Sequence, residues 1–148
     1  MPASDYSVPP LSAQDALVAI MVAVSASDEH ITSNELLSIG RMIEALPVFD
    51  GFDRDHLPRI SQTVFDLFEE EDGLEAFFGI VRDALPDNLQ ETAYALACDV
   101  AAADGHAFQA ELRFLEELRY EFDIDRLHAA AIERGSAARH RRLMPEAD

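Results

Sequence analysis

Two stretches of the chain share one spacing of residues that could bind a metal ion. Residues 25–42 read SASDEHITSNELLSIGRM, and residues 101–118 read AAADGHAFQAELRFLEEL. Each stretch holds an aspartate, then a histidine, then a glutamate, and the two sets are Asp28, His30, Glu35 and Asp104, His106, Glu111. Carboxylate oxygens suit calcium and magnesium, whereas an imidazole favours zinc or manganese. The spacing indicates a divalent-cation site in each stretch, with the four acids as the main candidates and the histidines as weaker ones.

A purely structural role for the same residues is an open alternative. Thr32 and Glu35 fit the S/T-x-x-E pattern of a helix start, where a cap stabilises by roughly 0.5–2 kcal/mol. The second stretch has Phe108 at the capping position, so Glu111 would either face the positive end of its helix or bind a ligand. Asp99 lies about one turn earlier and is either a solvent-facing acid or a third carboxylate beside the second loop. An EF-hand is excluded because the intervening ligands are missing.

Apolar residues at helical spacing predict the elements that position these acids. Ser12 with Asp15 resembles a capped helix start, and Pro58 suits the first turn of a helix. No stretch alternates apolar and polar residues over the length of a strand, so the prediction is an all-α domain of about seven helices. Leu36, Leu37 and Leu112 belong to the apolar stripes and are expected in the core. The expected helices span about 13–27, 32–46, 58–68, 72–85, 88–103 and 108–122, followed by a short last helix capped by Asp123.

The chain divides into an arm, one domain and a tail. We expect a loose arm at 1–11, a helical domain at 12–133 and a basic tail at 134–148 that is either frayed or folded back on the acidic body. Within the domain, units at about 16–46 and 92–122 contain the repeated stretches. They predict an internal pseudo-twofold repeat of helix-loop-helix units in a compact bundle.

Composition limits the partners and the compartment. Twenty-nine acidic against eleven basic residues give a net charge of −18, which disfavours nucleic acid and favours cations and basic protein surfaces. The single cysteine, Cys98, permits no internal disulfide, fits a reducing cytoplasm and is expected to be an inert packing thiol. The longest apolar run, at 16–26, is shorter than the roughly 20 residues that span a bilayer, so no membrane insertion is expected.

An apolar helix running into AAADGHAFQAEL, with Asp-Gly followed after a fixed gap by glutamate, resembles the TerB-like domain of tellurite-resistance proteins. The same domain type precedes the J-domain in some membrane-anchored co-chaperones. The resemblance loosely covers 12–133 and implies a helical domain without established enzymatic activity, linked to stress resistance and to a TerC-like membrane protein at the cytoplasmic face. The metal ligands suggested for the family would fall on Asp104 and Glu111, and on Asp28 and Glu35. Glu29 departs from the Asp-Gly that is typical of the family.

Together these features predict a non-enzymatic cytoplasmic module in stress or tellurite resistance, acting through a protein partner and a divalent cation. One alternative is a purely structural acidic helical protein that forms a homodimer. Another is a hydrolase that depends on a carboxylate-bound metal. The sequence disfavours an enzyme because it has no glycine-rich phosphate loop and no Ser-His or His-Cys set at a recognisable spacing.

Overall fold

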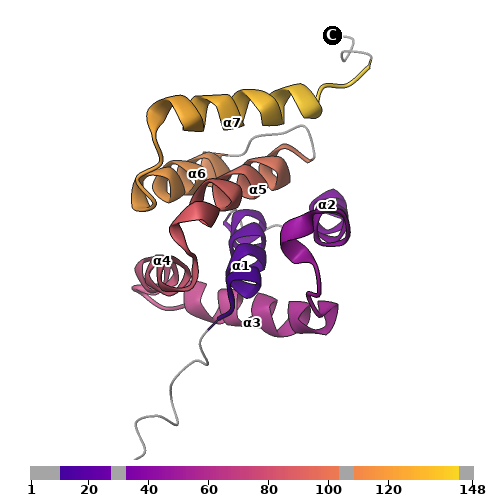
Figure 1. Ribbon diagram of the computed structural model, residues 1–148. Helices are drawn as coiled ribbons and strands as arrows, with labels where there is room; N and C mark the ends of the chain where they lie inside the picture. Colours follow the sequence, from indigo (N-terminus) through magenta and orange to yellow (C-terminus); the bar gives the residue numbers. More distant parts are fainter. Residues whose placement is uncertain (1–10, 28–32, 104–108, 144–148) are drawn as a thin grey trace, which may run out of the picture.

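The computed structural model describes residues 11–27, 33–103 and 109–143. Within these ranges the chain forms seven α-helices and no strand, which confirms the predicted all-α bundle (Figure 1). The internal repeat stays a prediction. The α-helices are α1 (Ala13–Ala26), α2 (Ser33–Ala45), α3 (Leu57–Phe68), α4 (Gly73–Ala84), α5 (Gln90–Ala102), α6 (Gln109–Glu121) and α7 (Arg126–Arg139), with the short 3₁₀ turns η2 (Pro47–Phe49), η3 (Arg54–His56) and η4 (Asp87–Leu89).

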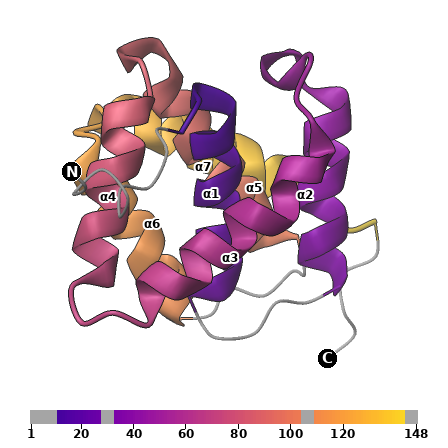
Figure 2. The same ribbon diagram turned by 90° about the horizontal axis from the view of Figure 1, so that it is seen from below.

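Helix α1 is the centre of the bundle. Every residue from Asp15 to Ser25 is buried, and the helix contacts α2, α3, α4, α5 and α6. Figures 1 and 2 show α1 enclosed by these helices. A helix that is apolar nearly all round can bury all of its apolar side chains only in such a central position. Helix α1 packs closely against α5 and α3.

Two helix starts follow the local signals in the sequence. Ser12 and Asp15 form a capping box at the start of α1, where the Ser12 hydroxyl accepts from the Asp15 backbone N–H at 3.0 Å. Pro58 lies in the first turn of α3, where a missing backbone N–H costs nothing. Both features need only neighbouring residues, which is why the sequence predicts them.

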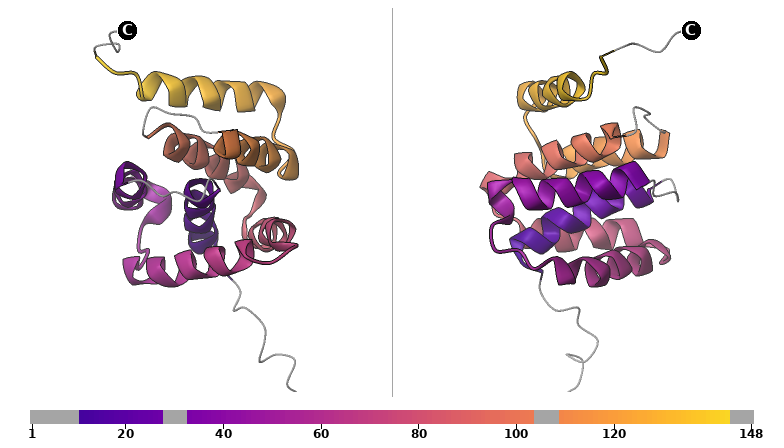
Figure 3. Two further views of the ribbon diagram at one scale, coloured as in Figure 1. Left: turned by 180° about the vertical axis from the view of Figure 1, so that it is seen from behind. Right: turned by 90° about the vertical axis from the view of Figure 1, so that its right-hand side faces the viewer.

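The last helix begins later and runs further than expected. The predicted cap, Asp123, instead has φ +49, and the carboxylate of Asp125 accepts from the backbone N–H groups of Leu127 and His128 at 3.0 and 3.1 Å. Helix α7 then continues to Arg139, so the first residues of the expected tail are helical. It packs against α5 as the outermost layer of the bundle, far from α3 (Figures 1 and 3).

The leucines at the start of α2 are not in the core, contrary to expectation. Leu36 and Leu37 are 55% and 56% exposed. The buried face of α2 is formed by Glu35, Ile39 and Ile43, which follow one another at four-residue intervals. Because a helix repeats every 3.6 residues, a buried residue 35 directs residues 36 and 37 away from the core.

Helix α6 departs from the prediction in the same way. Leu112 is 43% exposed, whereas Glu111, Phe114 and Leu118 are buried. In each helix a glutamate occupies the interior position of the first turn, and the leucine that follows it faces solvent. None of the helices in the described ranges combines the length and apolar character that a bilayer span requires.

Candidate functional site

The two glutamates of the repeated spacing both have buried side chains. Glu35 is 2% exposed and Glu111 is 0% exposed. Each lies in the first turn of its helix, α2 and α6 respectively, where the helix dipole favours negative charge. Removing a carboxylate from water is costly unless hydrogen bonds or positive charge compensate. We call these two helix starts, with the loops that precede them, the acidic junctions (residues 28–35 and 104–111).

Helix capping is one structural role for a buried acid in the first turn of a helix, and α1 contains an example. Asp15 is 8% exposed, and its carboxylate accepts from the Ser12 backbone N–H at 3.4 Å within the capping box. Glu35 has Thr32 at the equivalent distance in sequence, so the same pairing is open to it. Glu111 has Phe108 there, and a phenyl ring accepts no hydrogen bond from the backbone. A reciprocal capping box therefore cannot explain the buried Glu111.

The other members of the repeated spacing lie outside the described residues. These are Asp28, His30, Asp104 and His106. Within the described ranges, no three His, Cys, Asp or Glu side chains gather in a way that could hold a metal ion. The two ligand sets therefore stay predictions, each with its glutamate placed in the interior.

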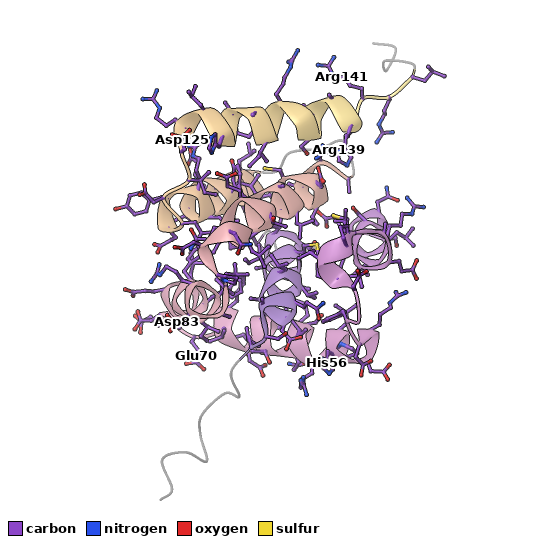
Figure 4. The ribbon with its side chains drawn as sticks, in the orientation of Figure 1. His56, Glu70, Asp83, Asp125, Arg139 and Arg141 are labelled. Carbon is purple, nitrogen blue, oxygen red and sulfur yellow. The ribbon has the colours of Figure 1, made fainter. Side chains whose placement is uncertain are left out.

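Asp99 contacts helix α7. Its carboxylate accepts from Arg139 Nη2 at 2.7 Å, and His140 Nδ1 lies 3.9 Å from the same oxygen. The side chain is only 18% exposed, so the expectation of a solvent-facing acid is wrong. The cause is α7, whose last turn covers this side of α5 and presents Arg139 to it (Figure 4). A role for Asp99 as a third ligand stays a prediction.

The family model described as Tellurite resistance protein TerB matches residues 14–134. The chain belongs to the TerB family. Comparison with curated proteins and with solved structures gives no match.

The TerB match extends from the first turn of α1 into α7. It therefore includes both acidic junctions and the buried Glu35 and Glu111, and it confirms the resemblance noted in the sequence. It ends within α7, at residue 134, so Arg139 and its contact with Asp99 involve chain beyond the matched part.

The TerB domain also contains a polar cluster between α5, α6 and α7 that the sequence does not predict, in which only Tyr94 is buried. The Tyr94 hydroxyl of α5 donates to Glu133 of α7, and Arg119 Nη1 of α6 donates to the same Glu133 oxygen at 3.3 Å. Burial and the hydrogen bond to Glu133 raise the pKa of Tyr94 above its ordinary value. The partners are 14 to 39 positions apart in the chain, so no local pattern reveals them.

Cys98 lies next to this cluster and is 7% exposed. Burial raises the pKa of its thiol to about 12, against a smaller lowering effect of the hydrogen bond with Tyr94. The thiol is therefore protonated at neutral pH, which agrees with the expectation of an inert packing residue.

Proposed function

We propose that this TerB-family protein is a non-enzymatic module of tellurite or stress resistance that binds divalent cations at its acidic junctions and acts through a protein partner. The observation that carries the proposal is the burial of Glu35 and Glu111 in equivalent first turns, at 2% and 0% exposure. The match to the family described as Tellurite resistance protein TerB supplies the physiological context.

The donor set fits a divalent cation in its chemistry. Asp104 and Glu111 would hold the ion at the second junction, and Asp28 and Glu35 at the first. Carboxylate oxygens are the ligands of calcium and magnesium, and the nearby histidines would extend the range to manganese or zinc. A bound cation would tie each loop to the start of its helix.

The charge of the whole chain supports a basic partner surface. A net charge of −18 steers cationic surfaces toward the protein and repels phosphate backbones and anionic lipid head groups. A TerC-like membrane protein, met at the cytoplasmic face, is the partner that the family suggests. The protein would then bind to the membrane protein without inserting into the bilayer.

Calorimetric titration of calcium, magnesium, manganese and zinc into chelator-stripped protein tests the cation sites. The titration uses roughly 0.15 M monovalent salt, where the Debye length is about 8 Å and diffuse attraction is screened. We expect saturable binding at two sites. Asp28→Asn and Asp104→Asn should each remove one site, whereas Asp83→Asn is the matched control, because Asp83 is an exposed acid at the end of α4 (Figure 4).

Two outcomes would contradict the proposal. Weak uptake that falls with salt and is equal in all variants would mean that the junction acids only cap helices and close loops, as in a structural acidic dimer. Hydrolysis of phosphoester or amide substrates by the metal-loaded protein, lost in Asp104→Asn, would mean that the protein is an enzyme.

A further inference from the structure

An open groove with an apolar floor lies where the turn between α3 and α4 meets α6. Its volume is about 840 Å³. Phe65 and Leu74 are 36% and 40% exposed along it, and Phe114 closes its inner side at 4% exposure. The floor is firmly supported, since the rings of Phe68 and Phe114 contact that of Phe77 with centroids 5.6 and 6.1 Å apart. The first contact is edge-to-face and the second is tilted, and both are favourable arrangements of aromatic rings.

The rim of the groove is acidic. Glu69, Glu70 and Glu71 follow one another in the α3–α4 turn, Glu117 lines the groove from α6, and Arg113 is the only base among the described residues of the lining. All five side chains are exposed. None of the five takes part in an ion pair within the described ranges, in contrast to Glu44, Glu121 and Glu133, which pair with arginines. The groove therefore presents an excess of negative charge around an apolar floor.

We propose that this groove docks a basic amphipathic helix of a partner protein. Bulky apolar side chains one turn apart on such a helix would rest on Phe65 and Leu74, and its lysines and arginines would face the glutamates of the rim. Charge of this sign steers a cationic segment to the groove and rejects acidic ones. Nucleic acid and anionic membranes are disfavoured for the same reason.

The groove borders the C-terminal end of α1 and the first turn of α6. Its lining includes Ala26, the last residue of α1, Ser27, its C-cap, and Ala110, in the first turn of α6. The docking proposal does not rest on cation binding, because the floor and rim belong to α3, α4 and α6. For this reason the test is performed with a chelator present.

Fluorescence anisotropy with a model helix tests the proposal. The probe is a labelled peptide of about 16 residues, roughly 24 Å long as a helix, made of leucines on one face and lysines on the other. One matched peptide replaces the lysines with glutamate, and a second replaces the leucines with serine. At roughly 0.15 M salt we expect saturable binding of the first peptide only, since it alone combines both features of the groove.

Matched protein variants locate the binding. Glu70→Gln with Glu117→Gln removes two rim charges and should weaken binding several-fold to tenfold, mainly through slower association. Asp83→Asn with Asp87→Asn removes the same charge from exposed positions at the far end of α4 and in η4, and should leave the affinity unchanged. Figure 4 labels Glu70 and Asp83, which lie close in that view because α4 is seen nearly end-on.

The apolar floor has its own test. Phe65→Ala should weaken binding by about tenfold, as expected for loss of an aromatic anchor, with a small effect on folding because the ring is already partly exposed. Three results would overturn the proposal. They are the absence of saturable binding, equal weakening by the rim and control variants, and sedimentation of the protein as a dimer that Phe65→Ala dissociates, which would assign the groove to a second copy of the chain.

Discussion

At the scale of single residues, burial determines the reactivity of Cys98. With a pKa of about 12, the thiolate fraction at pH 8 is about 10³ times smaller than that of a free cysteine with a pKa near 8.5. We expect a disulfide thiol reagent to react with the native protein at least about 10³-fold more slowly than with the urea-unfolded protein. Absorbance of the released chromophore measures both rates. Similar rates in the two states would mean that the thiol is accessible and activated.

His128 gives a pH dependence of known sign. Its Nδ1 lies 2.7 Å from Glu91 Oε2, and the hydrogen bond and charge of Glu91, with a contribution from Asp125, raise the pKa of His128. A group with a raised folded-state pKa adds stability that is complete below its ordinary value of about 6.5 and is lost as pH rises through the raised value. The pair joins α7 to α5, so its loss weakens that contact at alkaline pH.

The corresponding test compares melting temperatures of the wild type and His128→Ala across this range. The difference between the two proteins should be larger near pH 5.5 than near pH 8.5, and Glu91→Gln should reduce that pH dependence in the same way. Because the side chain is exposed, the effect will be small. A difference that does not change with pH would show that the ion pair adds nothing to stability.

At the scale of elements, two glycines of α4 predict opposite effects of one substitution. A Cβ at Gly73 would lie 1.6 Å from the backbone oxygen of Leu67, whereas a Cβ at Gly79 meets nothing within 4 Å. Gly73→Ala should therefore destabilise by roughly 2–3 kcal/mol, because backbone atoms must move. Gly79→Ala should stabilise by roughly 0.5–1 kcal/mol through higher helix propensity. Urea unfolding measures both, and a change of the same sign in both variants would contradict this account of the α3–α4 turn.

Local signals account for what the sequence predicts at this scale. The Ser12–Asp15 capping box and the first-turn position of Pro58 depend only on neighbouring residues, so the sequence predicts both helix starts correctly. The expectation that Leu36 and Leu112 lie in the core is wrong. Hydrophobicity alone does not reveal that a glutamate takes the interior position of the first turn. The repeated spacing identified Glu35 and Glu111 as special without indicating that they are buried.

Tertiary contacts account for what the sequence does not predict. The pairing of Asp99 with Arg139 joins residues 40 positions apart, and the Tyr94–Glu133 hydrogen bond joins residues 39 positions apart. Each depends on the packing of α7 against α5, which no spacing within one helix indicates. Arg139, which the sequence analysis assigns to the tail, binds Asp99 from the last turn of α7.

At the scale of the whole molecule, the acidic rim of the groove is part of a strongly acidic protein. The chain carries a net charge of −18, and the groove with its rim of glutamates borders the C-terminal end of α1 and the first turn of α6. Repulsion among these acids destabilises the compact state, and cations or a basic partner would relieve it. Any cation stabilises such a surface diffusely, so a specific site must be separated from screening by a measurement that locates the ion.

A two-dimensional ¹H–¹⁵N NMR titration of the chelator-stripped protein with calcium, magnesium, manganese or zinc, at roughly 0.15 M monovalent salt, makes that separation most directly. We predict saturable changes in the amide signals of residues 28–36 and 104–112, with the signals of α3 and α4, including Gly79, unchanged. Paramagnetic broadening by manganese should affect the same two segments first. Small, non-saturating shifts spread over exposed acids such as Glu70 and Asp83 would contradict the account and leave the acidic junctions with a structural role only.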